Sequence, residues 1–464
     1  MTLNAKRYDA ILIGAGQANN PLARSLAESG WDVALVEREH VGGTCINEGC
    51  TPSKTMIASA RVAHVVRRAA DFGVTTGPVS LNLKKVRQRK RDIVQSFREG
   101  GRRRLEATEG VDLLLGEGRF MGPKSVEVLM NDGSTRHLAA DTIFINTGQR
   151  PRIPDLPGLD TAPALNSTSV MELVDVPEHL LVLGGGYVGV EFAQMFRRFG
   201  SQVTIVQRSD QVLTHEDRDI AQEILEILCE DGVTVLLGTD ALGVDRDADG
   251  VVRLRVAGPG GEKVLLGSHL LLAVGRVPNT DRLNLDAAGI ETYRGGYIEV
   301  NERLETSVPG IYALGDVRGG LAFTHVSYDD FRIVRTNLLD GGDATTNDRL
   351  MTYTVFIDPQ LGRAGLTERM ARDRGYDVKV AKMPMSHVAR ALEADESRGI
   401  MKAVVEAETD EILGAAVLGL EGGEIASVLL VAMMGGLPYM ALRDAVLPHP
   451  TLSEALNNLF TAWE

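Results

Sequence analysis

A strand, a glycine-rich loop, a helix and a second strand are predicted twice in this chain, and this duplication constrains the fold most. The first copy comprises strand 8–13, loop 14–16, helix 21–29 and strand 33–36. The second comprises strand 180–183, loop 184–189, a helix through 199 and strand 203–206. The spacing from Gly14 to Glu37 equals that from Gly184 to Gln207. Such units are typical of dinucleotide-binding folds, so we expect an α/β protein with a duplicated domain.

Each copy is followed by a further strand with a related ending, at 143–151 and at 271–278. A third strand signal, at 310–316, ends in Gly315-Asp316, where a carboxylate can meet a ligand at the carboxyl edge of a sheet. Strand-like runs at 401–405 and 412–418 and a helical run at 424–434 then predict a separate α+β domain.

The two glycine loops differ at positions that contact a nucleotide. In the first, a helix N-terminus can face a pyrophosphate and Glu37 can accept from a ribose hydroxyl. Asn19 stands where a third glycine is usual, so either the helix lies farther from the strand or Asn19 adapts locally. The second loop keeps Gly184, Gly186 and Gly189, and Gln207-Arg208 replaces the acid. Arg208 could pair with a 2′-phosphate, which favours NADPH over NADH; alternatively Arg208 is solvated and either nucleotide serves.

Cys45 and Cys50 follow the first copy directly, among Gly42, Gly43 and Gly49. Glycines permit close approach of a flat ring. The run 51–53 looks like a helix start, which would place Cys50 near a helix N-terminus and stabilise its thiolate. We interpret the two cysteines as a redox disulfide rather than as inert thiols. Cys229 is predicted to be a core residue of a helix.

Composition excludes some classes of partner. Lys and Arg number 49 against 63 Asp and Glu, a net charge of −14, which disfavours nucleic acid or an anionic membrane as partner. The basic run 84–104 is interpreted as a solvated helix face, with an electropositive binding patch as the alternative. We find no apolar run of about 18 residues and no signal-peptide core. Three cysteines do not make a disulfide scaffold, so we expect a cytoplasmic protein. We also expect no metal site.

His449 lies between two prolines, with Glu454 five residues later. A lone histidine is usually structural. A His–Glu pair is also how a catalytic base is oriented and its imidazolium stabilised.

Together these motifs resemble the class I pyridine nucleotide–disulfide oxidoreductases, a family that includes glutathione reductase, dihydrolipoamide dehydrogenase and mercuric reductase. The resemblance covers nearly the whole chain. It implies two Rossmann-like domains, for FAD and NAD(P), and a C-terminal α+β dimerisation domain. The implied boundaries are 1–150 and 275–345 for FAD, 151–274 for NAD(P) and 346–464 for dimerisation.

The resemblance also implies roles for individual residues. Electrons would pass from NADPH, with NADH possible, through FAD to Cys50, the flavin-side thiol, and Cys45 would attack the substrate. Lys54 and Glu191 match an ion pair beside the flavin, Tyr187 matches a gate over it, and His449 and Glu454 match an acid–base dyad from the other subunit of a homodimer. The implied FAD residues are Gly14, Gly16, Glu37, Thr44, Gly118, Thr147, Gly148 and Asp316. The implied NAD(P) residues are Gly184, Gly186, Tyr187, Gly189, Arg208 and Gly275.

Within the family, the contexts of Thr44-Cys45 and of 322–330 look most like mercuric reductase. No cysteine follows Cys229, however, so the C-terminal pair of that enzyme is lacking. Leu447 and Gln207 depart from the dihydrolipoamide dehydrogenase pattern. We therefore expect an NADPH-dependent reductase of a small disulfide. The alternatives are a mercury or copper ion reductase that uses the single pair, and a dihydrolipoamide dehydrogenase-like subunit of a multienzyme complex.

Overall fold

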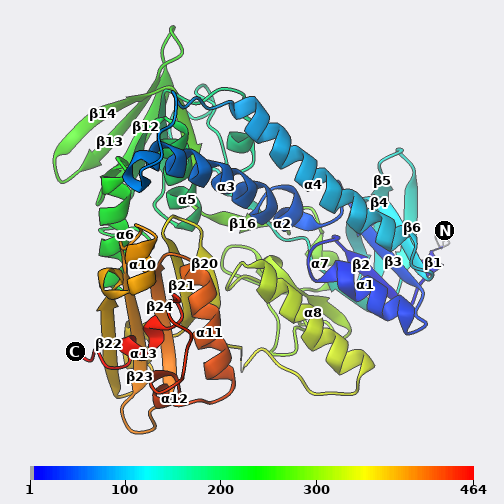
Figure 1. The fold of residues 1–464 in the computed structure, drawn as a ribbon. Coiled ribbons are helices and arrows are strands. Elements are labelled where there is room, and N and C mark those ends of the chain that lie inside the picture. The colour runs from blue at the N-terminus through cyan, green and yellow to red at the C-terminus, as the bar shows by residue number, and fades with distance from the viewer. Residues whose placement is uncertain (1–4, 348) are drawn as a thin grey trace. The chain divides into compact units, whose positions relative to one another are not determined.

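The computed structural model describes residues 5–347 and 349–464. Internal contacts divide the chain into two compact units, which are described separately (Figure 1). The first unit comprises 1–55, 85–152 and 275–349. The second comprises 56–84, 153–274 and 350–464.

The first unit is built on an eight-stranded sheet in the order β1-β6-β5-β4-β3-β2-β7-β19. Its strands are β1 (Lys6–Arg7), β2 (Ala10–Ile13), β3 (Val33–Glu37), β4 (Val111–Gly122), β5 (Ser125–Met130), β6 (Thr135–Ala139), β7 (Thr142–Ile145) and β19 (Ile311–Ala313). The neighbouring pairs β4–β3, β3–β2, β2–β7 and β7–β19 are parallel. Strand β5 pairs antiparallel with both β4 and β6. Every residue of β2 is buried, as expected of a parallel strand covered on both faces.

The second unit contains a four-stranded parallel sheet in the order β11-β10-β9-β15. These strands are β9 (His179–Leu183), β10 (Gln202–Val206), β11 (Thr234–Leu236) and β15 (His269–Leu272). An antiparallel meander of β12 (Asp240–Arg246), β13 (Val252–Gly258) and β14 (Gly261–Gly267) extends the same region (green in Figure 1). The predicted second copy therefore folds as a parallel α/β sheet.

The C-terminal part of the second unit is an antiparallel sheet in the order β20-β21-β24-β23-β22 (Figure 1). Its strands are β20 (Thr352–Val355), β21 (Gln360–Gly365), β22 (Val378–Pro384), β23 (Ile400–Glu406) and β24 (Ile412–Gly419). Helix α11 (Gly422–Met434) packs on β21 and β24, and α13 (Ala455–Leu459) packs on β22 and β23. Met401, Val417, Leu429 and Phe460 belong to the resulting apolar core. The α+β architecture expected for this region is confirmed.

The remaining short strands and the helices complete the described chain. Short antiparallel pairs join β8 (Gln149–Pro151) to β16 (Arg276–Pro278) and β17 (Thr292–Tyr293) to β18 (Tyr297–Ile298). The helices are α1 (Asn19–Glu28), α2 (Gly43–Asn47), α3 (Cys50–Arg67), α4 (Leu83–Glu106), α5 (Tyr187–Phe199), α6 (Arg218–Glu230), α7 (Leu285–Ala288), α8 (Thr324–Leu339), α9 (Glu368–Asp373), α10 (Ala389–Glu393) and α12 (Tyr439–Arg443). The 3₁₀ turns are η1 (Ala69–Phe72), η2 (Ser169–Glu172), η3 (Gly315–Arg318) and η4 (Met385–His387).

One prediction about a helix is wrong. Cys229 lies on α6, but its side chain is exposed rather than in the core. The buried face of α6 includes Ile224, Ile227 and Leu228. The next position turns by about 100° around the axis and therefore leaves that face.

The basic run lies on α4, and its side chains divide between water and the protein. Lys84 and Arg91 are exposed, as a solvated face requires, but Lys90 is only 4% exposed. Arg98 donates from Nε to Asn47 Oδ1 at 2.9 Å, and Arg89 donates to the Thr55 carbonyl at 2.9 Å. Part of the run therefore braces the segment that carries the two cysteines.

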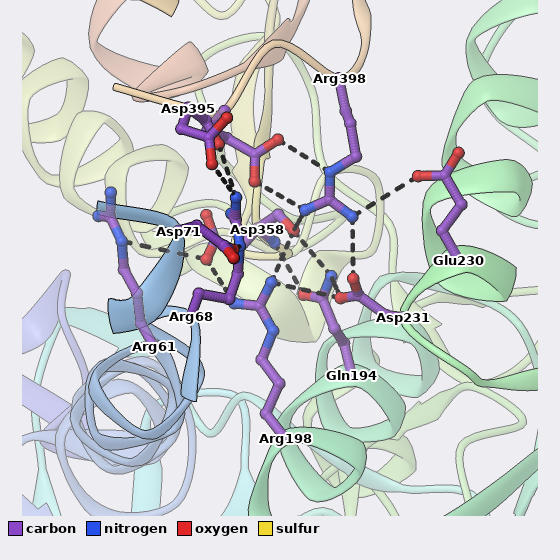
Figure 2. Close-up of polar contacts among 11 residues, drawn as sticks. Arg61, Arg68, Asp71, Gln194, Arg198, Glu230, Asp231, Asp358, Asp395 and Arg398 are labelled. Carbon is purple, nitrogen blue, oxygen red and sulfur yellow. Dashed lines mark hydrogen bonds and ion pairs between the residues drawn. The ribbon is translucent and has the colours of Figure 1, made fainter. Parts of the chain in front are cut away.

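A network of ion pairs, shown in Figure 2, lies within the second unit, and its centre at Arg198 and Asp231 is buried. Arg198, near the end of α5, pairs with Asp231 at 3.2 Å and, more closely, with Asp358. Arg398 pairs with Asp231 at 2.8 Å. Arg198 is 5% exposed, so this charge is held almost entirely by protein carboxylates.

Candidate active site

The first glycine loop opens onto a cavity of about 440 Å³ within the first unit. Predicted FAD residues line it: Gly14, Gly16, Glu37, Thr44, Gly118 and Thr147. Glu37, at the end of β3, accepts from the backbone N–H groups of Ala15 at 2.8 Å, Glu39 at 2.8 Å and His40 at 3.2 Å. The carboxylate is therefore oriented before any ligand arrives.

The loop approaches its neighbours more closely than side chains would allow. A Cβ at Gly14 would lie 2.5 Å from the Asn146 carbonyl oxygen, and Gly14 has φ +91°. A Cβ at Gly43 would lie 2.9 Å from the Gly16 Cα, so the cysteine-bearing segment packs directly on the nucleotide loop. The glycines therefore let the loop, the strand end at Asn146 and the cysteine-bearing segment pack together beside the cavity, and the residues that line it suit FAD.

Asn19, the departure from the glycine pattern, adapts locally. It is fully buried, and its Nδ2 donates to the carbonyls of Gly14 at 2.9 Å, Ile13 at 3.3 Å and Phe144 at 3.4 Å. Helix α1 begins at Asn19, whereas α5 begins at Tyr187, which corresponds to Gln17. The side-chain amide thus occupies space that a third glycine would leave to the backbone.

The two cysteines are brought together as thiols. Cys45 lies on α2, and Cys50 is the first residue of α3, as the sequence predicts. A hydrogen bond between the thiols, together with burial, raises the pKa of Cys45 far above its ordinary value. Lys54 and Thr324 act in the opposite direction on that pKa. Cys50 is exposed and Cys45 is intermediate in exposure, so neither thiol is sealed in the core.

Three residues with clear contacts in the first unit were not singled out from the sequence. Thr324, at the start of α8, places Oγ1 3.4 Å from Cys50 Sγ. Asp330 is fully buried and accepts from Gly315 N at 2.7 Å and from Arg318 Nε at 2.9 Å. Asn146 donates to the Leu314 carbonyl at 2.6 Å. The last two fix the turn that carries Asp316. Asn146 directly follows β7, which is a sequence signal, whereas Asp330 lies within α8, where no local pattern assigned it a role.

Asp316 lies in the 3₁₀ turn η3, and burial raises its pKa, with Arg276 opposing the shift. Gly148 follows β7, and Gly275 directly precedes β16. Neither Asp316 nor Gly148 lines the cavity of the glycine loop. Their assignment to FAD remains a prediction.

The second glycine loop lies in the second unit, at the start of α5. A Cβ added at Gly189 would lie 2.0 Å from the Gly184 carbonyl oxygen. A Cβ added at Gly186 would meet nothing within 4 Å. Gly189 therefore serves close helix–strand packing, and Gly186 leaves open space for a ligand. Gln207 Oε1 accepts from Gly185 N at 2.9 Å, the contact that Glu37 makes in the first copy. Arg208 is exposed, and Tyr187 is 37% exposed.

The remaining predicted catalytic residues are placed as follows. His449 Nδ1 lies 2.9 Å from Glu454 Oε2, so the predicted dyad is formed. The His449 side chain is 68% exposed. Lys54 lies on α3 in the first unit, whereas Glu191 lies on α5 in the second and accepts from Phe356 N at 2.8 Å.

Comparison with known proteins identifies the family. Residues 8–330 match the pyridine nucleotide-disulphide oxidoreductase model, and residues 351–460 match the dimerisation domain of the same family. The chain belongs to the pyridine nucleotide-disulphide oxidoreductases. It is therefore a flavoprotein oxidoreductase of a family that uses FAD and NAD(P)H, and its dimerisation domain supports a homodimer.

Similar relatives cover nearly all of this chain. The probable pyridine nucleotide-disulfide oxidoreductase RclA of Escherichia coli is 39% identical over 98% of this chain and 99% of its own length. A mercuric reductase of Staphylococcus aureus is 34% identical over 97% of this chain and 81% of its own. A dihydrolipoyl dehydrogenase of Thermus scotoductus is 36% identical over 97% of this chain and 96% of its own length.

Among solved structures, a Cu(II) complex of the HOCl-induced flavoprotein disulfide reductase RclA from Escherichia coli has a TM-score of 0.89. It is 37% identical and covers 98% of this chain and 99% of its own. Within the described part of this chain, no group of three or more His, Cys, Asp or Glu side chains is placed to hold a metal ion. Nor does that part include a helix long and apolar enough to cross a bilayer.

Proposed function

We propose that this flavoprotein reductase uses NADPH and delivers two electrons, through Cys45 and Cys50, to a small disulfide. The observation that carries the proposal is the hydrogen-bonded thiol pair, on a segment packed directly against the nucleotide loop at Gly43 and Gly16. Two cysteines that share a hydrogen bond are suitably placed to form a reversible disulfide.

FAD would be held by the loop at Gly14 and Gly16, by Glu37 on the ribose, and by backbone near Thr44 and Thr147. When bound, FAD accepts a hydride from the nicotinamide and returns the electrons as a pair to a disulfide. The protein supplies orientation: Glu37 is already fixed by three backbone N–H groups, and Asp330 fixes the turn at Gly315.

The reduced pair would act by thiol–disulfide exchange. Cys45 loses its proton, and its sulfur attacks one sulfur of the substrate, forming a mixed disulfide and expelling the first thiolate. Cys50 then attacks Cys45, which re-forms the internal disulfide and expels the second thiolate. The raised pKa of Cys45 means that a base must take its proton. His449, oriented by Glu454, suits that role and can return protons to the leaving thiolates.

A preference for NADPH is supported by a difference in the hydrogen bonds of Glu37 and Gln207, which stand at corresponding positions before the turn that follows the second strand of each copy. In the first copy, Glu37 Oε1 accepts hydrogen bonds from the backbone N–H groups of Glu39 and His40. In the second, the corresponding Gln207 atom is Nε2, a donor, which binds the Gln211 carbonyl at 3.2 Å. Because Nε2 is a donor, it cannot accept hydrogen bonds from the backbone N–H groups of Ser209 and Asp210. These N–H groups could therefore donate to an anion, such as a 2′-phosphate, beside Arg208.

We further propose that the homodimer supplies His449 and Glu454 to the cysteine pair of the other subunit. The match of 351–460 to a dimerisation domain and the 68% exposure of His449 support this arrangement. A cytoplasmic location suits a pair that must be reduced to act.

The test is NADPH oxidation by the purified holoenzyme with a panel that includes oxidised glutathione and lipoamide. Cys45→Ser should lower disulfide turnover by about a thousandfold, and His449→Ala by about a hundredfold, with flavin still bound. Cys229→Ser is the matched control and should stay within about twofold. Disulfide turnover that survives in Cys45→Ser would contradict the proposal.

Copper is a second candidate substrate, because the structural relative was solved as a Cu(II) complex. The dithiol would become a disulfide and release two protons while two Cu(II) ions become Cu(I). This reaction expels no thiolate that must be protonated, and Cu(II) binding to the sulfurs displaces their protons to water, so it needs neither the donor nor the base that His449 would supply. NADPH oxidation that depends on Cu(II) and Cys45, and that His449→Ala leaves unchanged, would favour copper over a disulfide.

A further inference from the structure

The segment 207–217, between β10 and α6, holds both backbone groups of Gly185 in the second glycine loop. Gln207 Oε1 accepts from Gly185 N at 2.9 Å, and Leu213 N donates to the Gly185 carbonyl at 2.9 Å. The position of the loop therefore follows the position of this segment.

Hydrogen bonds continue through the segment toward its end. Gln207 Nε2 donates to the Gln211 carbonyl, and Gln211 Nε2 donates to the Glu216 carbonyl, each at 3.2 Å. Glu216 N donates to the Leu213 carbonyl at 2.8 Å. Leu213 has φ +44°, a left-handed conformation that is unfavourable for leucine. Such a conformation persists only where its surroundings impose it.

The far end of the segment is anchored in the C-terminal sheet. Glu216 forms an ion pair with Arg363 of β21, and the two side chains are 2% and 1% exposed. The Tyr353 hydroxyl on β20 donates to the same carboxylate, and burial beside Glu216 raises the pKa of Tyr353, which keeps it a donor. Next to it, Asp217 accepts from Glu368 N at 2.9 Å and pairs with Lys402 at 3.1 Å.

A fully buried ion pair contributes little net stability, because desolvation offsets the attraction. Apolar residues of similar volume would hold the two elements together at least as well. What an ion pair adds is a defined relative position, since a displaced partner leaves a buried charge unpaired.

We propose that Glu216 and Arg363 are positioning residues for the pyridine nucleotide: through segment 207–217 they fix the glycine loop, so the C-terminal sheet sets nucleotide affinity. This inference rests on the proposed nucleotide site at 184–189. Neither residue is expected to contact the nucleotide.

The test measures NADPH binding to holoenzyme directly, by titration, alongside steady-state kinetics. Glu216→Gln should raise the Kd by about tenfold, with kcat at saturating NADPH and FAD content within about twofold. The double variant Glu216→Gln/Arg363→Met removes the uncompensated charge and should recover thermal stability while its Kd stays raised. Gln211→Ala, which breaks one link of the chain, should raise the Kd by about threefold and serves if Glu216→Gln does not fold.

The matched control is Asp358→Asn, which breaks the buried pair with Arg198 shown in Figure 2. It should lower stability and leave the Kd for NADPH within about twofold. A double variant that regains wild-type Kd together with its stability would overturn the inference, as would an Asp358→Asn variant as weak in NADPH binding as Glu216→Gln. A wild-type protein that binds no pyridine nucleotide would instead refute the proposed function.

Discussion

The two glycine loops occupy equivalent places in two duplicated sheets, yet they hold their helices by different means. In the first, the Asn19 amide donates to three strand-end carbonyls. In the second, Gly189 brings helix backbone against the Gly184 carbonyl with no room for a Cβ. The same fold thus tolerates a polar side chain or close backbone contact at one position, and the neighbouring residues decide which. Asn146 stands beside the first loop, and Ala273 beside the second.

Gly189→Ala should break the second loop most severely. Its Cβ would lie 2.0 Å from the Gly184 carbonyl oxygen, so the helix must shift. We expect NADPH affinity to fall by about a hundredfold, with FAD retained because the first loop is untouched. Titration with NADPH and flavin absorbance measure the two quantities.

Gly186→Ala sharpens the same comparison. An added Cβ there meets nothing within 4 Å, so thermal stability should not change, while crowding of the ligand should still weaken NADPH binding. A stable Gly189→Ala variant with normal NADPH affinity would show that the close contact has no role.

Asn19→Leu should damage the first loop. It leaves the carbonyls of Gly14, Ile13 and Phe144 without this donor in a buried place, which should cost about 2–3 kcal/mol of unfolding free energy. FAD occupancy should fall while NADPH binding by the loaded fraction stays normal. Urea unfolding and flavin content check this, and a stabilised Asn19→Leu would contradict the hydrogen-bonding account.

Gln207→Glu would make the second loop resemble the first. The new carboxylate can still accept from Gly185 N, but its other oxygen would face the Gln211 carbonyl and repel a 2′-phosphate. The ratio of kcat/KM for NADPH over that for NADH should fall by about tenfold. An unchanged ratio would mean that Arg208 alone, or neither residue, sets the preference.

The smallest expected difference is in pH dependence. His179 begins β9 in the second copy, where the first copy has Asp9. Burial lowers the pKa of His179 below 6.5, and its Nε2 lies 2.9 Å from Thr204 Oγ1. The unfolded state therefore binds the proton first, so stability is lost as pH falls from about 6.5 toward the lower folded pKa. His179→Gln should reduce that loss, as urea unfolding at pH 7 and pH 5 would measure.

The sequence predicts those parts of the fold and site that depend on residues near one another in the chain. Both strand–loop–helix units, the helix beginning at Cys50 and the His449–Glu454 contact are of this kind. The contacts missed join distant positions: Thr324 meets Cys50 across 274 residues, and Arg363 meets Glu216 across 147. No local sequence pattern identifies such partners, because the sequence does not distinguish an arginine that will be buried from one that will be exposed. The exposure of Cys229 was missed for a related reason: consecutive residues of a helix point in different directions, so Leu228 is buried whereas Cys229 is exposed.

The anchor at Glu216 has a consequence for the order in which the protein is made. The second glycine loop emerges from the ribosome long before Tyr353, Arg363 and Lys402, which hold its supporting segment. A nascent chain that stops short of β21 therefore lacks the partners that force Leu213 into its unfavourable conformation. On the role proposed for this anchor, the second glycine loop reaches its final position only after β23, the strand that carries Lys402, has been made.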